Sequence, residues 1–418
     1  MTASTDATVA ARPGEPATTI RWAAWAGDRD LPISFPGGWT MTVCAPHDAP
    51  DLGPTEIAEA IANPIGSPRL AQLAAGKQRP CIVIDDLTRP TRGHLLVPPI
   101  LDELERAGIP ARDVLVLAGV ANHRPMLHED LVLKLGADVL SRCRVLNHFS
   151  FDNCTPIGDT SEGTPIEINA DFLASDLRIL VGSIIPHGAA GFSGGAKLLM
   201  PGIASARSAL AFHRGSATRG KWGVNETPAR LESEEAARMA GVDFIVNSVP
   251  TSRLGVGAVV AGDLVAAHRA GIRHARRIFA SPTPAGLDAC VLSLYPKDGE
   301  FLQHITALAP WLTAPEPIVR EGGTVVVCLA GGEGFGVHAL FGPGMPLQAG
   351  RATRLRGRDL VFLCPTLAAG ELPDTVRDGT VLLPTWEATR QWLEAKHGHQ
   401  ASVAVFPCAT MQLADAVC

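Results

Sequence analysis

The segment "PCIVIDDLTRPT", Pro80–Thr91, combines an unbroken apolar run with an abrupt polar ending. Such a short run, rich in β-branched residues, is typical of a strand that is buried on both faces of a sheet. A helical pattern, "LLVPPILDELERAG" at 95–108, follows it, and a second apolar run, "RDVLVLAG" at 112–119, comes next. Alternating strand and helix patterns indicate a largely parallel sheet that is covered by helices.

The alternation continues along the chain in two series. In the first series, further strands are expected at 143–148, 164–169, 177–185, 243–249 and 255–262, and further helices at 128–136, 227–241 and 264–279. In the second series, strands are expected at 288–295, 323–331, 359–364, 379–384 and 401–406. The Pro- and Gly-rich stretch "ASPTPAGLD", residues 280–288, separates the two series. We therefore predict two α/β domains with largely parallel sheets, residues 20–280 and 281–418, with an active site in the cleft between them. Residues 1–19 are expected to form a loose tail.

The composition of the chain excludes several classes of protein. The 418 residues carry a net charge of −6 without a basic run, so no nucleic-acid partner is expected. The first nineteen residues lack the apolar core of a signal peptide, and no window of about eighteen apolar residues predicts a membrane span. The nine cysteines are odd in number and contain no Cys-x-x-Cys pair. This usage is typical of a reducing, cytoplasmic location rather than of a disulfide framework or a zinc site.

Polar side chains follow three of the expected strands. The first strand is followed by Asp86 and Arg89, the second by His123, and the most apolar one by His187 and Lys197. In open parallel sheets, ligands bind at the carboxyl ends of the strands. Each residue alone has a structural explanation, because an aspartate can cap a helix, a histidine can be hydrogen-bonded and a lysine can be solvated. Their joint occurrence at three strand ends favours a functional site.

The glycine-rich loop "GAAGFSGGAK", residues 188–197, matches a phosphate-binding P-loop only in part. A P-loop places Ser or Thr after its lysine to hold magnesium, whereas Leu198 follows Lys197 here. A nucleoside triphosphatase is therefore not favoured. The loop instead predicts a turn whose backbone N–H groups face a phosphate-bearing cofactor, with Lys197 touching the cofactor or bonded to it.

The residue types at the strand ends also indicate a reaction. Arg89 can bind a carboxylate through two parallel hydrogen bonds. His123 and His187, on opposite sides of a carbon atom, can alternate as general base and acid, because imidazole titrates near neutrality. This is the arrangement of a racemase or epimerase. Removing a hydrogen beside a carboxylate needs an electron sink that side chains lack, so a cofactor anchored at Lys197 is expected.

Several segments carry a resemblance to a known family. The most specific is Pro-His…Gly-Phe-Ser-Gly-Gly-x-Lys…His, which spans 186–213. The others are "SFPGGW" at 34–39, "EIAEAIANPIGSPRLAQLAAGK" at 56–77, "DDLTRPT" at 85–91, "HRPM" at 123–126, "DFIVNSV" at 243–249, "AGDLVAAH" at 261–268 and "YPKDGEFLQ" at 295–303. Together they resemble the nickel-pincer-nucleotide-dependent lactate racemase family over essentially the whole chain.

The resemblance implies a nickel cofactor that separate biosynthesis enzymes make. In this nickel pincer nucleotide, Ni(II)-pyridinium-3,5-bisthiocarboxylic acid mononucleotide, two sulfur arms and a ring carbon hold the metal. By position, Lys197 is similar to the lysine that is linked covalently to the cofactor through a thioamide. His213 is similar to the remaining nickel ligand. The family's cofactor-binding turn is matched by Asp86, Leu87, Thr88 and Arg89.

The resemblance also implies the roles of the histidines and of the substrate contacts. His123 and His187 match the acid/base pair, of which one takes the hydroxyl proton while the C2 hydrogen passes as hydride to the cofactor ring. The planar 2-keto acid then takes the hydride back on either face. Arg89 and Gln303 match substrate-binding positions, whereas Thr306 stands where the lactate enzyme has lysine. Threonine supplies no charge to a carboxylate, so a 2-hydroxy acid other than lactate is expected.

We therefore expect a cytoplasmic racemase or epimerase that acts on a small-molecule 2-hydroxy acid with the nickel pincer nucleotide bound to Lys197. Two alternatives stay open. A non-catalytic binding protein for a phosphorylated small molecule or cofactor needs the glycine-rich loop and Arg89 but not both histidines. A pyridoxal-phosphate-like enzyme uses Lys197 to form a Schiff base.

Overall fold

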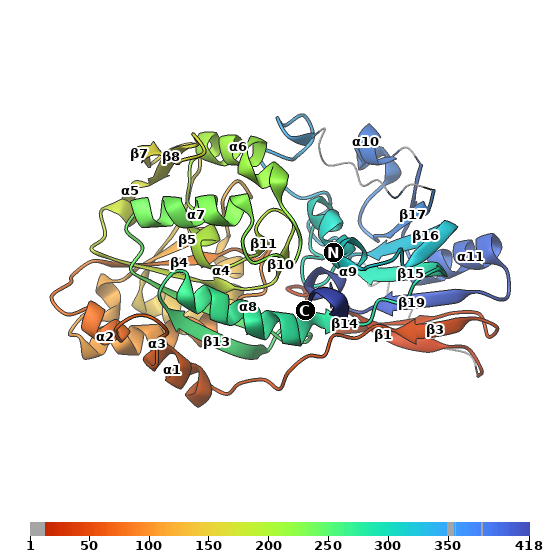
Figure 1. Cartoon of the computed structure of the whole chain (residues 1–418), viewed down its shortest axis with the longest axis horizontal. Coiled ribbons are helices and arrows are strands. Elements are labelled where there is room, and N and C mark those ends of the chain that lie inside the picture. Colours follow the sequence, from red (N-terminus) through yellow and green to blue (C-terminus); the bar gives the residue numbers. More distant parts are fainter. Residues whose placement is uncertain (1–12, 349–354, 356, 378) are drawn as a thin grey trace. The chain divides into compact units, whose positions relative to one another are not determined.

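The computed structural model describes residues 13–348, 355, 357–377 and 379–418. The chain divides into two compact units. The central unit comprises His47–Phe279 and Val337–Leu340, and the terminal unit comprises the residues up to Pro46 with Ala280–Gly336 and Phe341–Cys418. Each unit contains its own six-stranded, largely parallel sheet (Figure 1). The α/β fold class that the sequence predicted is therefore confirmed.

The sheet of the central unit has the strand order β13-β12-β9-β4-β5-β6. Neighbouring strands are parallel except for β13, which runs antiparallel to β12. The strands are β4 (Pro80–Asp85), β5 (Leu115–Gly119), β6 (Arg144–Asn147), β9 (Leu177–Ser183), β12 (Phe244–Pro250) and β13 (Val256–Gly262). All six overlap the ranges expected from the sequence.

Helices cover both faces of this sheet, because its strands are apolar on both faces. In β4, Ile82 and Ile84 point into one apolar layer, and Cys81 and Val83 point into the other. The first layer contains α1 (Pro54–Ala62), α2 (Leu70–Leu73), α3 (Gly93–Arg106) and α4 (His128–Arg142). The second contains α5 (Ala170–Leu173), α6 (Ala206–Arg214), α7 (Pro228–Met239) and α8 (Ala266–Phe279). A strand between two such layers turns polar only at its end, which is where the candidate site begins.

Two antiparallel hairpins of the central unit lie outside its sheet. They are formed by β7 (Cys154–Asp159) with β8 (Pro165–Asn169) and by β10 (Pro186–His187) with β11 (Gly191–Phe192). The strand expected at 164–169 thus pairs within a hairpin. Three short 3-10 helices complete the unit: η1 (Ala111–Asp113), η2 (Gly195–Leu198) and η3 (Ser216–Arg219).

The sheet of the terminal unit has the order β18-β17-β16-β15-β19-β3, and all of its neighbours are parallel. The strands are β3 (Thr40–Val43), β15 (Leu287–Ser293), β16 (Val319–Cys328), β17 (Asp359–Leu363), β18 (Thr380–Leu383) and β19 (Ser402–Phe406). One apolar layer contains η4 (Phe301–Leu308) and α9 (Ala309–Thr313). The other contains α11 (Trp386–His397) and the hairpin of β1 (Ala17–Trp22) with β2 (Arg29–Ser34). The smaller elements are β14 (Ala280–Ser281), η6 (Ala369–Glu371), α10 (Asp374–Arg377), η7 (Ala409–Met411), β20 (Leu413–Ala414) and η8 (Asp415–Val417).

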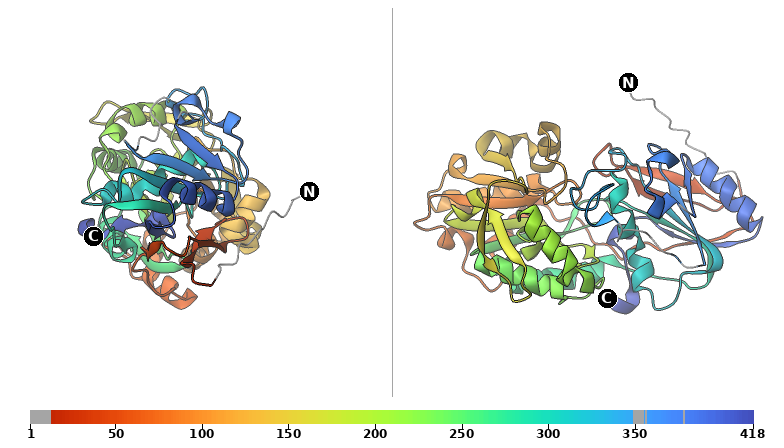
Figure 2. Two further views of the ribbon diagram at one scale, coloured as in Figure 1. Left: turned by 90° about the vertical axis from the view of Figure 1, so that its right-hand side faces the viewer. Right: turned by 90° about the horizontal axis from the view of Figure 1, so that it is seen from above.

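Residues 13–46 belong to the terminal unit, which differs from the contiguous domains expected from the sequence. The reason is that β3 pairs with β19, with Thr40 opposite Ser402. Figures 1 and 2 show these N-terminal strands, in red, beside the C-terminal strands, in blue. The expected loose tail at 1–19 is wrong for its last residues, because β1 begins at Ala17 and pairs with β2. Residues 1–12 lie outside the described residues. The expected junction near residue 280 falls between Phe279 and Ala280.

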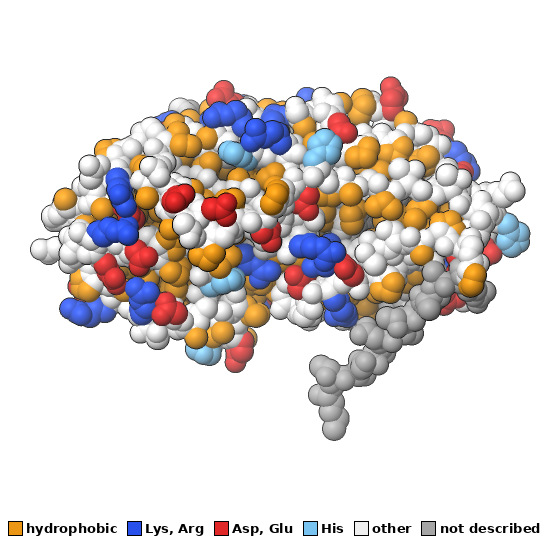
Figure 3. Space-filling view, turned by 90° about the horizontal axis from the view of Figure 1, so that it is seen from below, with side chains coloured by type: hydrophobic (Ala, Val, Ile, Leu, Met, Phe, Trp, Pro, Cys, Tyr) orange, Lys and Arg blue, Asp and Glu red, His pale blue; other side chains and the backbone are white. Residues whose placement is uncertain are grey.

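The surface carries charges of both signs. On the face drawn in Figure 3, Lys and Arg side chains are interspersed with Asp and Glu side chains. Within the described ranges, no helix has the length and apolar character that crossing a membrane requires.

Candidate active site

The candidate site lies at the carboxyl ends of three strands that are direct neighbours. The sheet places β4 between β9 and β5, and all three run parallel. Their carboxyl ends therefore lie side by side at one edge of the sheet. The turns that follow them carry the aspartate, arginine, histidine and lysine side chains that the sequence singled out.

The turn after β4 is organised by the carboxylate of Asp86. Its Oδ1 accepts hydrogen bonds from the backbone N–H and the hydroxyl of Thr88, at 3.0 and 2.5 Å. Arg89 donates from Nη1 to the Thr88 hydroxyl oxygen at 2.8 Å. Leu87 packs against the apolar cluster formed by Ala118, Val120 and Met126. The four residues thus form a turn with a fixed geometry, anchored to the loop that carries His123.

Asp86 also orients the first predicted catalytic histidine. Its Oδ2 lies 2.8 Å from His123 Nδ1. Burial by itself raises the pKa of Asp86, but the His123 ring, Arg89 and the Thr88 hydroxyl lower it more strongly, and the pKa lies well below its usual value. The carboxylate is therefore ionised and holds the proton of the ring on Nδ1. The lone pair of His123 then lies on Nε2, the nitrogen that can take a proton from a substrate.

A buried lysine that the sequence did not identify supports this turn. The side chain of Lys134, on α4, is fully buried, and its Nζ lies 2.7 Å from Asp85 Oδ1. The same Nζ donates to the carbonyl oxygens of Asp86 and Arg89, at 2.6 and 2.9 Å. Burial lowers the pKa of Lys134, and the charge of Asp85 opposes this effect. In the sequence, Lys134 looks like an exposed residue of an amphipathic helix, and only its partners in the fold reveal its position.

The second predicted catalytic histidine, His187, lies on β10 and is oriented by its own loop. Its Nδ1 accepts hydrogen bonds from the N–H groups of Ala189 and Ala190, at 3.1 and 3.3 Å. The neutral ring therefore carries its proton on Nε2. The neutral ring of His123 therefore has a lone pair at Nε2, whereas the neutral ring of His187 has an N–H there. A general base and a general acid need this division of roles in one direction of a reaction.

Several backbone N–H groups of the glycine-rich loop are hydrogen-bonded within the protein and do not face a phosphate, whereas the prediction of a phosphate contact stays a prediction for the rest of the loop. The described hydrogen bonds join Phe192 N to Ala190 O, Ser193 N to Ile185 O, Gly195 N to Asn247 Oδ1 and Lys197 N to Gly194 O. The glycines are needed for close packing. A Cβ on Gly191, where φ is +69°, would lie 1.7 Å from Val224 O, and one on Gly195 would lie 2.9 Å from the His268 ring. The loop is a compact support for Lys197.

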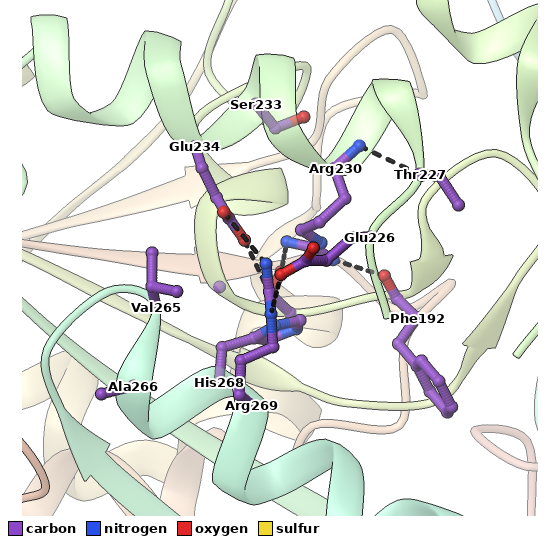
Figure 4. Close-up of polar contacts among 12 residues, drawn as sticks. Phe192, Glu226, Thr227, Arg230, Ser233, Glu234, Val265, Ala266, His268 and Arg269 are labelled. Atoms are coloured by element: carbon purple, nitrogen blue, oxygen red, sulfur yellow. Dashed lines mark hydrogen bonds and ion pairs between the residues drawn. The ribbon is translucent and has the colours of Figure 1, made fainter. Parts of the chain in front are cut away.

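Arg230, on α7, holds this loop from the interior (Figure 4). Its side chain is fully buried, and it donates from Nη1 to Gly194 O at 3.0 Å and from Nη2 to Phe192 O. Burial lowers the pKa of Arg230 to about 9, although Glu234 opposes this effect. Glu234 is also paired with Arg269, at 2.8 Å. Arg230 could not be identified from the sequence, because α7 has the pattern of an ordinary charged amphipathic helix.

Lys197 lies at the end of the loop, on η2, with a partly buried side chain. Its Nζ lies 6.0 Å from the centre of the Phe212 ring, and the described residues provide it with no hydrogen-bond acceptor or carboxylate. Burial, followed by the positive charges of Arg89 and Arg230, holds the pKa of Lys197 well below its usual value. These conditions favour a neutral, nucleophilic amine.

His213 lies near the end of α6, whose first turn is capped by the Ser205 hydroxyl. Its Nδ1 donates to Ala209 O at 2.7 Å, which leaves the lone pair on Nε2. The ring is edge-on to Phe212 at 5.5 Å, and Lys197 Nζ lies 6.0 Å from the centre of the same phenyl ring. A neutral imidazole with a fixed Nδ1–H is the usual state of a metal-binding histidine. One phenyl ring thus lies near both the predicted anchor and the predicted metal ligand.

The two predicted substrate residues of the terminal unit lie on η4. Gln303 donates to Glu300 Oε1 at 2.9 Å, and the Thr306 hydroxyl donates to Gln303 O at 2.8 Å. Both side chains are partly buried. His304, between them, instead stacks on Phe301 with ring centres 4.6 Å apart and belongs to the apolar core. The roles of Gln303 and Thr306 toward a substrate stay predictions.

The comparisons with known proteins agree on one family. A model of the lactate racemase N-terminal domain matches residues 26–223. A lactate racemase of Lactiplantibacillus plantarum is 34% identical over 291 residues, which cover 67% of this chain and 68% of that protein. The chain belongs to the lactate racemase family. A lactate racemase of Thermoanaerobacterium thermosaccharolyticum is 32% identical over 291 residues, which cover 67% of each protein. As a member of the lactate racemase family, the chain is a racemase and hence an isomerase.

Two solved structures share the fold of this lactate racemase family member. The lactate racemase apoprotein of Thermoanaerobacterium thermosaccharolyticum superimposes with a TM-score of 0.75 at 22% identity, over 95% of this chain and all of the other. A protein of Thermotoga maritima superimposes with a TM-score of 0.66 at 17% identity, over 86% of this chain and 98% of the other. At these identities the likeness concerns the fold alone.

Proposed function

We propose that this chain inverts the C2 stereocentre of a 2-hydroxy acid with the help of a nickel pincer nucleotide bound to Lys197. The observation that carries the proposal is the Asp86–His123 pair, which fixes an imidazole with its lone pair on Nε2. Membership of the lactate racemase family supports the reaction type.

The residues around Lys197 fit such a cofactor. A neutral amine can form a covalent thioamide, and the Nε2 lone pair of His213 can bind nickel. Within the described part of the chain, no three His, Cys, Asp or Glu side chains cluster so that they could hold a metal ion. A nickel ion at His213 therefore needs ligands from the cofactor itself. When bound, the cofactor supplies the acceptor for the C2 hydrogen.

The protein residues then move the hydroxyl proton and hold the substrate. His123 takes the proton at Nε2, and its new charge is stabilised by the ionised carboxylate of Asp86. The Nε2–H of His187 is the matching donor. Arg89 binds the substrate carboxylate, since its guanidinium is positioned by the Thr88 hydroxyl and its carbonyl oxygen is held by Lys134.

We further propose that the substrate is a 2-hydroxy acid other than lactate. Thr306 is neutral, and its hydroxyl already donates to Gln303 O, so it supplies no charge to a carboxylate. The names of the relatives make lactate the first compound to test. Faster racemisation of lactate than of longer, aromatic or polyhydroxylated 2-hydroxy acids would refute this part of the proposal.

The cofactor is tested by mass. Protein co-produced with the cofactor-making enzymes should carry about one nickel per chain and a covalent adduct in its intact mass. The adduct should vanish in Lys197→Ala and persist in Lys221→Ala, a matched variant of an exposed lysine. His213→Ala should lose nickel, whereas His123→Ala and His187→Ala should retain it and lose turnover. Unmodified wild-type protein under these conditions would exclude the proposal.

A stereochemical screen of 2-hydroxy acids separates the enzyme from the alternative binding protein. The loaded wild-type chain should interconvert the two C2 epimers of at least one acid. Binding of a phosphorylated compound without any turnover, unaffected by His123→Ala, would favour the non-catalytic alternative.

A further inference from the structure

A short segment of the central unit, Val337–Leu340, crosses the loop that carries His123. His338 forms an antiparallel bridge with His123, and the Ala339 N–H donates to Asn122 O at 2.8 Å. The two imidazole rings lie with their centres 4.8 Å apart and their planes at 57°. Backbone pairing on this segment fixes the ring contact. His338 is therefore a third imidazole of the candidate site, one that the sequence did not identify.

The tautomer of His338 is set by its own backbone. The Leu340 N–H donates to His338 Nδ1 at 3.0 Å, so the neutral ring carries its proton on Nε2. The His123 ring carries its proton on Nδ1, because Asp86 binds that nitrogen. Protonation of His123 at Nε2 thus brings positive charge next to a ring that offers only another N–H. Two imidazoles in contact also repel each other when both are charged, so their protonation is coupled.

The other charged groups near His123 act in both directions. The ion pair with Asp86 favours a proton on the ring, and the positive groups oppose it. Arg124, the neighbour of His123 in sequence, is paired with Asp130 at 2.5 Å, so its charge is largely offset. The charged groups that the described contacts place near His123 include Asp86 and Arg89 from the turn after β4, Lys134 from α4, and the Arg124–Asp130 pair.

We infer that His338 and His123 form a coupled pair in which His338 opposes protonation of His123. The functional importance of this coupling rests on the proposed function, in which the His123 ring must be neutral before it takes the hydroxyl proton of the substrate. Asp86 alone would keep the ring protonated to higher pH, and His338 counteracts it. His338 is thus a positioning residue that acts through His123 and does not need to touch the substrate.

The test is an NMR titration of the cofactor-free, full-length protein with ¹³C-labelled histidine. The His123 signal is assigned from its loss in His123→Gln. In His338→Phe, which keeps an aromatic ring but has no N–H, the titration midpoint of His123 should rise by about one pH unit, a tenfold gain in proton affinity. In His338→Lys, which keeps a cation, the midpoint should stay at or below that of the wild type. Val337→Ala, an exposed position of the same segment, is the matched control and should leave the midpoint unchanged.

An unchanged or lower midpoint in His338→Phe overturns the inference, as does the same midpoint in His338→Phe and His338→Lys. This result does not depend on racemase activity, because neither cofactor nor substrate is present. In the loaded enzyme, the acidic limb of turnover should move with the midpoint. A midpoint that moves while the limb stays leaves the coupling intact and refutes His123 as the catalytic base.

Discussion

Replacing His148 with glutamine should reduce the loss of stability that the protein undergoes at acidic pH. His148 is 1% exposed, its Nε2 lies 3.0 Å from Ala204 O, and its Nδ1 lies 3.3 Å from the Asn169 amide nitrogen. Burial lowers the pKa of His148 from 6.5 to about 4, although the bond to Ala204 opposes this shift. Ala204 directly precedes Ser205, the N-cap of α6, so the neutral ring supports the helix that carries His213.

The sign and size of the effect follow from these pKa values. Between pH 6.5 and pH 4 the unfolded chain binds a proton at His148 and the folded chain does not, so stability is complete above 6.5 and falls as the pH falls. Linkage gives a loss of about 2 kcal/mol between pH 7.5 and pH 5.0 from this one group. Glutamine can still donate to Ala204 O but does not titrate. When the pH falls from 7.5 to 5.0, the free energy of unfolding of His148→Gln should therefore rise by about 2 kcal/mol relative to that of the wild type.

Urea unfolding followed by ¹⁹F NMR of 5-fluorotryptophan-labelled protein checks this prediction. Of the seven tryptophans, Trp222 is the one in the central unit, so its signal reports unfolding of that unit alone. Ser233→Ala is the control, since the buried hydroxyl donates to Ala229 O at 2.8 Å and has no titratable proton in this range. It should lower the free energy of unfolding equally at both pH values. An effect of His148→Gln that is the same at pH 7.5 and pH 5.0 would refute the reasoning.

Two further substitutions test the supports of the site with the same urea assay. Lys134→Met should lower the free energy of unfolding by about 3–5 kcal/mol, because it leaves the Asp85 carboxylate without the cation that lies 2.7 Å away. An unchanged urea midpoint would contradict a stabilising role of this buried ion pair. Gly191→Ala should cost several kcal/mol, because its Cβ would lie 1.7 Å from Val224 O. Gly163→Ala is the control, because Gly163 has a similar positive φ of +78° and its added Cβ would have no atom within 4 Å. It should cost only about 1 kcal/mol. Equal losses in both variants would show that packing is not the cause.

The strand ends could be predicted from the sequence, because each strand is apolar along its length and polar only where it ends. The neighbouring positions of β9 and β4 could not be predicted in this way, because β5 to β8 lie between them along the chain, and the structure supplies this pairing. The buried cations could not be predicted. Lys134 and Arg230 lie in helices whose patterns suit a solvated charge, and their burial depends on which carbonyl oxygens the fold brings to them. His338 could not be predicted either, because its partner His123 lies far away in the chain.

The glycine-rich loop shows a second limit of sequence reasoning. Its glycines are compatible with an open anion-binding turn and with a tightly packed one, since both need a backbone without Cβ atoms. The choice depends on atoms from distant segments, here Val224 O against Gly191 and the His268 ring against Gly195. The predicted role of Lys197 as the cofactor anchor is the same in the open turn and in the packed turn.

Two buried cations have a common function in this site. Lys134 binds the carbonyl oxygens of Asp86 and Arg89, and Arg230 binds those of Gly194 and Phe192. Each cation thus fixes the backbone of one loop. Burying a charge costs free energy, and hydrogen bonds to several carbonyl oxygens offset part of that cost. The charge of Arg230 also affects the predicted cofactor anchor, because Arg230 contributes to the low pKa of Lys197. The cation that orders the glycine-rich loop therefore adds to the effect of burial, which favours the neutral form of the predicted anchor amine.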